Sequence, residues 1–169
     1  MGTKMKIRTI KRILIIFLIN HIFAGMPNFE MKRKLLNMIG ISVGVNTKVV
    51  GPIFCSGQLS IGENCWIGKN FTVNGNGSVS IEDNCDIAPE VTFLTGGHKI
   101  GEKERRAGEG EIYSVHVKSG CWLGARSTIL GNIIIEKGSV VAAGALVRSN
   151  VDENTLVGGV PAKYIKDLD

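Results

Sequence analysis

Residues 117–163 read VKSGCWLGARSTILGNIIIEKGSVVAAGALVRSNVDENTLVGGVPAK and repeat with a period of six. Steps of six from Val117 reach an aliphatic residue each time: Leu123, Ile129, Ile135, Val141 and Val147. The residue two positions before each stop is also small or apolar. This period fits neither an amphipathic helix nor a half-buried strand. It is typical of a chain that turns a corner every six residues, and three such sides make one coil of a parallel β-helix.

The same period begins directly after Gly40 and continues, with one change of phase, to Phe93. It breaks at His98, and residues 99–116 are charged and aperiodic, which predicts an external loop. We therefore expect an all-β fold, a left-handed parallel β-helix of about five coils. This three-sided solenoid would occupy residues 41–169, with a looser closing turn over 150–161 and a short terminal helix over 164–168.

Residues 1–40 differ in composition and predict a separate helical arm. Two helices are expected, over about 6–23 and 29–38, joined by a turn. The arm carries eight Lys or Arg against Glu30 alone, whereas the remainder has twelve basic and fourteen acidic residues. The apolar stretch 13–19 is too short to span a bilayer. Two roles stay open: packing against the first coil or a neighbouring subunit, and contact of the basic arm with a membrane surface.

The four cysteines, at positions 55, 65, 85 and 121, have no metal-ligand spacing. All four fall in inward phases of the repeat, so we expect buried free thiols, no metal site and a reduced compartment. The sequence therefore favours a cytoplasmic location, with the inner face of the membrane as the alternative if the arm binds lipid.

Several segments together resemble a known family. The repeats IGENCWIGKN and IEDNCDIAPEVT, the pattern from Thr95 to His98, the EIY of residues 111–113, CWLGA and the closing GVPAK are similar to the hexapeptide-repeat acyltransferases. Within them, the match is to the galactoside and maltose acetyltransferase branch. The basic arm looks more like that of bacterial polysaccharide O-acetyltransferases. The resemblance covers about residues 40–166.

Transfer of an acetyl group to a hydroxyl needs a base, and a neutral imidazole titrates near the working pH. His98 stands where the repeat breaks, after two glycines that let the backbone turn. The resemblance implies that His98 is this base. It also implies that Glu111 orients the imidazole, although Glu111 could equally be a solvated loop acid.

The resemblance further implies a groove for acetyl-CoA, used as a co-substrate. Trp122 would flank the acetyl arm, the amides of Gly124 and Ala125 would stabilise the oxyanion, and small residues would line the groove. Cationic side chains would meet the phosphates, and two asparagines, which are otherwise ordinary turn residues, would hold a sugar hydroxyl. The remaining residues of this prediction are Ala142, Ala143 and Gly144 for the groove, Arg148, Lys163 and Lys166 for the phosphates, and Asn74 and Asn76 for the acceptor.

The sequence as a whole predicts an O-acetyltransferase that uses acetyl-CoA and a carbohydrate acceptor, such as a unit of a bacterial surface polysaccharide or its precursor. A three-sided prism suits a homotrimer. No nucleophile elbow or phosphate-binding loop is present, so direct transfer in a ternary complex is expected, and no nucleic-acid partner is expected. Two alternatives remain: a serine or amino-sugar acetyltransferase, and a non-catalytic solenoid scaffold.

Overall fold

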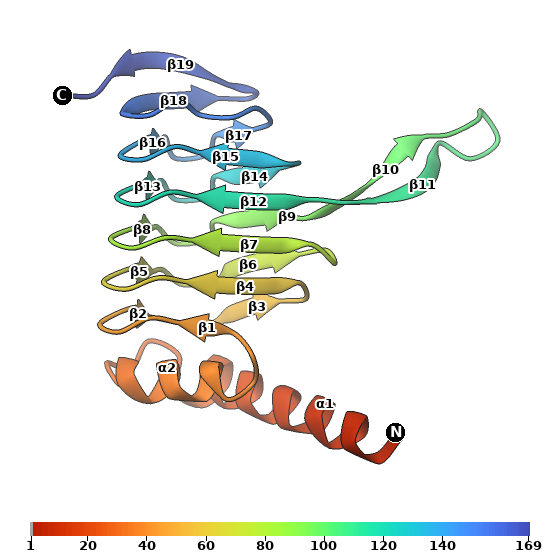
Figure 1. Ribbon diagram of the computed structural model, residues 1–169, viewed down its shortest axis with the longest axis vertical. Coiled ribbons are helices and arrows are strands. Elements are labelled where there is room, and N and C mark those ends of the chain that lie inside the picture. The colour runs from red at the N-terminus through yellow and green to blue at the C-terminus, as the bar shows by residue number, and fades with distance from the viewer. Residues whose placement is uncertain (1) are drawn as a thin grey trace.

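A computed structural model describes residues 2–169, with side chains from residue 9 onward. The chain winds into a three-sided solenoid of five complete turns and a partial sixth, above two helices (Figure 1). Each side is one parallel sheet, named here A, B and C in the order in which the chain visits them. The corners between successive sides are the A–B, B–C and C–A corners.

The strands of each sheet stack one coil upon the next. Sheet A contains β1 (Ser42–Val43), β4 (Gln58–Ile61), β7 (Ser78–Ile81), β12 (Ser114–Val117) and β15 (Ile133–Ile135). Sheet B contains β2 (Lys48–Val49), β5 (Trp66–Ile67), β8 (Asp86–Ile87), β13 (Trp122–Leu123), β16 (Val140–Val141), β18 (Thr155–Gly159) and, antiparallel to β18, β19 (Ala162–Asp167). Sheet C contains β3 (Ile53–Cys55), β6 (Phe71–Asn74), β9 (Thr92–Leu94), β14 (Thr128–Leu130) and β17 (Leu146–Val147).

The six-residue period is the inward face of this solenoid. Every stop from Val117 to Val147 is at most 1% exposed, and the residues two positions before each stop are buried as well. Successive side chains of a strand point to opposite faces, so each short side sends two residues into the core. The predicted fold is confirmed, and the core consists mainly of stacked Ile, Val and Leu, with Phe71 and Phe93 at 5.6 Å between ring centroids.

At the A–B and B–C corners the chain turns at a residue with a left-handed backbone conformation, which in most coils stands three positions after the buried stop. At the A–B corner these residues are Asn46, Asn64, Asn84, Gly120, Gly138 and Asn154. Asn and Gly adopt this conformation most readily, which explains their spacing in the sequence. At the B–C corner the same position holds Glu90 and Arg126, which form an ion pair of 2.8 Å between adjacent coils.

The N-terminal arm closes the lower end of the solenoid. Helix α1 (Gly2–Phe17) continues as a π-helical turn, η1 (Leu18–Ile22), and α2 (Phe29–Asn37) follows. Ile19 and Leu36 are fully buried, and the Asn20 side chain bonds both the N–H and the C=O of Ile53, each at 2.9 Å. The expected packing of the arm against the first coil is therefore confirmed. Among residues 2–169, no helix combines the length and apolarity needed to cross a membrane.

Three local expectations differ from the structure. The excursion after His98 is an antiparallel hairpin of β10 (Gly96–Ile100) and β11 (Ala107–Ile112), which projects far from the body (Figure 1). It begins and ends earlier than the expected loop 99–116, since residues 114–116 already belong to β12 in sheet A. The terminal helix expected over 164–168 is wrong: β19 forms a strand there, because it covers the otherwise open edge of β18. That partial sixth turn also exceeds the expected five coils.

The four cysteines are free, and three of them form a buried column. Cys65, Cys85 and Cys121 precede strands β5, β8 and β13, which are paired in register. The Cys65 and Cys85 thiols each donate to a carbonyl of the next coil at 3.2 Å, and Cys121 does so at 3.1 Å. Cys55 is only half-buried, so the expectation of full burial holds for three of the four.

Candidate active site

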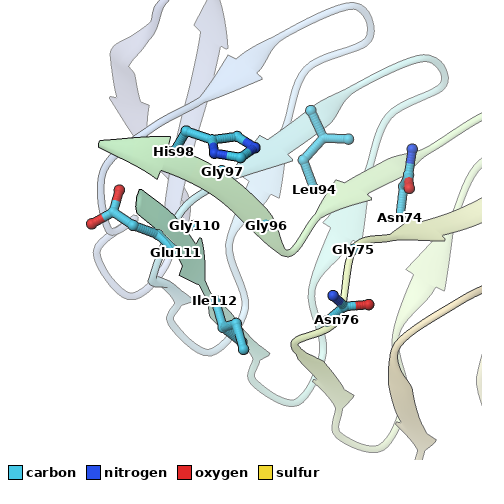
Figure 2. A pocket seen from close by; sticks show the side chains of 10 residues that line it. All are labelled: Asn74, Gly75, Asn76, Leu94, Gly96, Gly97, His98, Gly110, Glu111 and Ile112. Carbon is cyan, nitrogen blue, oxygen red and sulfur yellow. The ribbon is translucent and has the colours of Figure 1, made fainter. Parts of the chain in front are cut away.

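The base of the hairpin and the C–A corner enclose a hollow that contains four of the predicted site residues. Asn74 is the last residue of β6, Asn76 lies in the turn that follows, His98 comes from β10 and Glu111 from β11 (Figure 2). Four glycines, Gly75, Gly96, Gly97 and Gly110, complete much of its wall. Asn74 and Glu111 are distant in the sequence but lie near each other in the structure. Asn74 pairs with Leu94 of the adjacent strand β9, and the hairpin that follows β9 pairs Gly97 with Glu111. We call this the His98 hollow.

The hydrogen bonding of His98 fixes which of its ring nitrogens can act as a base. Nδ1 lies 2.8 Å from the carbonyl oxygen of Gly108, on the opposite strand of the hairpin. A carbonyl only accepts hydrogen bonds, so Nδ1 carries the proton and donates it. The neutral ring therefore keeps its lone pair on Nε2, and the His98 side chain is exposed.

Glu111 does not orient His98 in this structure, contrary to the expectation. In the hairpin, His98 pairs with Gly110 and Glu111 pairs with Gly97, so His98 and Glu111 project from opposite faces. Figure 2 shows the two side chains leaving the hairpin in different directions. The Glu111 carboxylate instead accepts a hydrogen bond of 2.9 Å from the Tyr113 hydroxyl, and this bond raises the pKa of Tyr113. The Gly108 carbonyl takes the orienting role.

A second group of predicted residues lies at the B–C corner of the two coils that follow β8, which contain β13 and β16. Trp122 is 56% exposed on β13, and Ala143 and Gly144 are exposed on the next coil. The two coils are joined by hydrogen bonds from Gly124 N–H to Val141 O at 2.8 Å and from Gly144 N–H to Ala125 O at 2.9 Å. The structure therefore brings Trp122–Ala125 and Ala142–Gly144 together along one corner.

These bonds decide which amide could stabilise an oxyanion. The N–H of Gly124 is already used within the coil ladder, so the expectation for Gly124 is not met in this chain. The amide of Ala125 has no hydrogen-bond partner within residues 2–169, and its side chain is half-buried. Ala125 is thus the one of the two whose main chain remains available as a donor.

The three predicted phosphate-binding cations fall into two places. Lys166 pairs with Leu156, which continues the outward column of Trp122 and Val140 on sheet B. Lys163 lies on the same strand, opposite Gly158. Arg148 follows β17 at the C–A corner, one side of the prism away. The two lysines therefore share a sheet with Trp122, and Arg148 does not.

Comparison with known proteins identifies the family of the repeat. Residues 114–149 match the family model "Bacterial transferase hexapeptide (six repeats)", and residues 58–88 match "Hexapeptide repeat of succinyl-transferase". The chain is 29% identical over 141 residues to galactoside O-acetyltransferase of Escherichia coli, covering 82% of this chain and 70% of that one. It is 34% identical over 123 residues to a putative acetyltransferase of Saccharomyces cerevisiae, covering 69% of this chain and 61% of that one. The chain belongs to the hexapeptide-repeat acetyltransferase superfamily.

A solved structure of this superfamily has the same fold. The hexapeptide-repeat acetyltransferase of Vibrio cholerae, determined in complex with acetyl coenzyme A, superimposes with a TM-score of 0.84 at 23% identity. The match covers 99% of this chain and 91% of that one. The present chain is therefore a hexapeptide-repeat left-handed β-helix over its described length.

Sequence reasoning missed two groups of this candidate site, Gly108 and Tyr113. Gly108 acts through its carbonyl, which any residue possesses, so no side-chain signal marks it. Tyr113 packs against Gly97, where a Cβ atom would collide with the tyrosine ring. Gly97 is therefore required by the ring of Tyr113 as well as by the turn before His98, and this glycine was the signal in the sequence that could have identified Tyr113.

Proposed function

We propose that this chain is an acetyl-CoA-dependent O-acetyltransferase whose acceptor is a saccharide hydroxyl, with His98 as the general base. The orientation of His98 supports the proposal most strongly, since the bond from Nδ1 to Gly108 leaves Nε2 as the proton acceptor inside a hollow. The similarity to galactoside O-acetyltransferase supports the class of acceptor. Asn74 and Asn76 line the same hollow, and their amides can both donate to and accept from sugar hydroxyls.

The reaction follows from these groups. The acceptor hydroxyl gives its proton to His98 Nε2 as its oxygen attacks the thioester carbonyl carbon of acetyl-CoA. The resulting oxyanion is met by the free N–H of Ala125. Collapse of the tetrahedral intermediate breaks the carbon–sulfur bond, and the protonated His98 returns its proton to the CoA thiolate. The products are an acetyl ester and free CoA, and no covalent enzyme intermediate is needed.

The two halves of this chemistry lie at different corners of one chain. The His98 hollow is at the C–A corner, whereas Trp122 and Ala125 belong to the B–C corner, and the hollows around His98 and Trp122 share no residue. The hairpin that carries His98 also projects away from its own solenoid (Figure 1). A cyclic trimer about an axis parallel to the solenoid would bring one corner of each copy to the other corner of the next. We infer that the active site is completed between neighbouring copies.

Substitution of His98 tests the proposal directly. His98→Ala should lower kcat by about 10²–10⁴-fold, because the base is lost, and should leave the affinity for CoA unchanged. CoA release is measured with a thiol reagent, using a galactoside, maltose, serine and glucosamine as acceptors. Fast turnover by His98→Ala contradicts the role of His98, and a preference for serine or for the amine of glucosamine contradicts the saccharide hydroxyl.

A further inference from the structure

The outer face of α1 is apolar, and no side chain among residues 9–169 covers it. Ile15 and Ile19 point into the base of the solenoid and are buried. At about 100° per residue, Ile10, Leu14 and Phe17 lie on roughly the opposite side of the helix. These three side chains are 51–57% exposed, and Ile13 beside them is 62% exposed. A helix that is apolar on both faces buries only one of them here, and a contiguous exposed apolar face marks an interaction site.

The charge of the same segment indicates what the partner is. Five cations, Lys4, Lys6, Arg8, Lys11 and Arg12, fall within nine residues, and the first acid of the chain is Glu30. Arg12 donates to the Cys55 carbonyl at 2.9 Å, so its charge is held against the solenoid. A second copy of the same face would bring like charges together and is disfavoured. An anionic surface is attracted, by roughly fivefold in affinity for each cation close to it.

The position of α1 under the solenoid makes the face accessible. Helix α1 lies across the lower end of the coil stack, and its first half extends beyond the body (Figure 1). Its apolar face is therefore directed away from the solenoid along the long axis. In the trimer proposed above, three such faces would lie on one side of the assembly, in about one plane. The presence of three faces in one plane rests on the proposed trimer, whereas the apolar face of a single α1 does not.

We propose that α1 docks on an anionic phospholipid membrane, with Ile10, Ile13, Leu14 and Phe17 immersed below the headgroups. An amphipathic helix with a basic end and large aliphatic and aromatic residues lies in the plane of the interface. The solenoid then stands on the membrane with its axis roughly along the normal, and the hairpin with His98 faces outward several coils above the lipid. An acceptor carried on a lipid could reach that hairpin without leaving the membrane.

The test is sedimentation of the full chain with phosphatidylcholine vesicles, with and without about 30% phosphatidylglycerol. We expect binding only to the anionic vesicles, and loss of binding as salt rises from about 0.05 to about 0.5 M. Leu14→Ser with Phe17→Ser should lower the partition coefficient roughly 30-fold, since two half-exposed side chains are no longer immersed. Phe54→Ser is the matched control, because Phe54 is 49% exposed but lies on β3, away from α1. This variant should bind vesicles as the wild type does.

Three results would overturn the inference. The first is no binding of the wild type to anionic vesicles, and the second is wild-type binding by the Leu14→Ser, Phe17→Ser variant. The third is a change in the oligomeric mass of that variant in lipid-free buffer, which would assign the face to another copy of the chain. Acetylation of a soluble acceptor by the same variant is measured in parallel, so that failure of membrane binding and failure of the proposed reaction are told apart.

Discussion

Lys32 is fully buried beneath the first coil, and its replacement by methionine should destabilise the fold. Its ammonium group donates to the carbonyls of Met26 at 3.0 Å, Val49 at 3.1 Å and Val50 at 2.7 Å. It also lies 5.3 Å from the centroid of the Phe29 ring. Three donors meet three acceptors, so the cation ties α2 to the end of the solenoid with no unused hydrogen.

The magnitude follows from what the substitution leaves behind. Lys32→Met keeps the apolar stem but removes all three hydrogen bonds. The bond to Val49 is buried, so its carbonyl is left unsatisfied, at a cost of about 1–3 kcal/mol. The carbonyl of Val50 retains the Gly25 N–H at 3.1 Å, and the bonds to Met26 and Val50 are only partly buried. Relief of the buried charge offsets part of the loss, so we expect a net decrease of about 2–3 kcal/mol in the free energy of unfolding.

Urea denaturation of wild type and variant measures this difference, and Lys34→Met is the matched control. Lys34 lies on the same helix with a side chain 69% exposed, 3.6 Å from Glu30, so its loss should cost less than about 0.5 kcal/mol. If Lys32→Met is no less stable than Lys34→Met, the buried cation does not hold the arm in place and this reasoning is refuted.

The pH dependence of the same pair gives an independent readout. Burial lowers the pKa of Lys32 below its ordinary value. Between the folded and the unfolded pKa the unfolded chain binds more protons, so the stability contributed by Lys32 rises with pH through that window and does not change with pH below it. We expect the wild type, but not Lys32→Met, to gain stability as the pH approaches about 10.

Two further predictions concern acidic side chains. Glu111→Gln should keep kcat/KM within about threefold of wild type, because the carboxylate contacts Tyr113 and not His98; a loss of about 100-fold would instead mean that Glu111 reaches the base during turnover. Glu82 accepts hydrogen bonds from Lys118 at 3.0 Å and from Ser119, and these bonds lower its pKa. Its stabilisation should be present at neutral pH and disappear as the pH falls through that lowered pKa, so thermal melts of Glu82→Gln should differ from wild type by less than about 1 kcal/mol at pH 7 and not at all in strong acid.

The repeat could be predicted from the sequence because each side of the prism buries its own residues. The buried positions from Val117 to Val147 can be recognised from the local six-residue period alone, without knowledge of any distant contact. The break at His98 was recognised from the same period. The hairpin could not be predicted, because its strands pair through backbone groups and bury little on either face. His98 and Glu111 were assigned to one another by family likeness, whereas the register of two strands decides which faces they occupy.

Residues 162–167 show the same difficulty at the C-terminus. Their composition was consistent with a short helix, but the edge of β18 offers unpaired backbone groups that a helix would leave exposed. The separation of Trp122 from His98 could not be predicted either. The corner that each residue occupies depends on how many sides of the prism separate the two residues along the chain, and this number is known only from the three-dimensional structure.

In the proposed trimer one chain supplies His98 and the next supplies the acetyl-CoA corner, and complementation of two inactive variants distinguishes this shared site from a site within one chain. His98→Ala retains an intact B–C corner, and Ala143→Trp fills that corner from an exposed position while retaining His98. In trimers assembled at random from equal amounts of both, about one site in four combines the two intact halves. We expect co-expressed variants to recover about a quarter of the wild-type rate of CoA release, while each alone is inactive. A mixture no more active than the separate variants would place both halves of the site within one chain and refute the shared site.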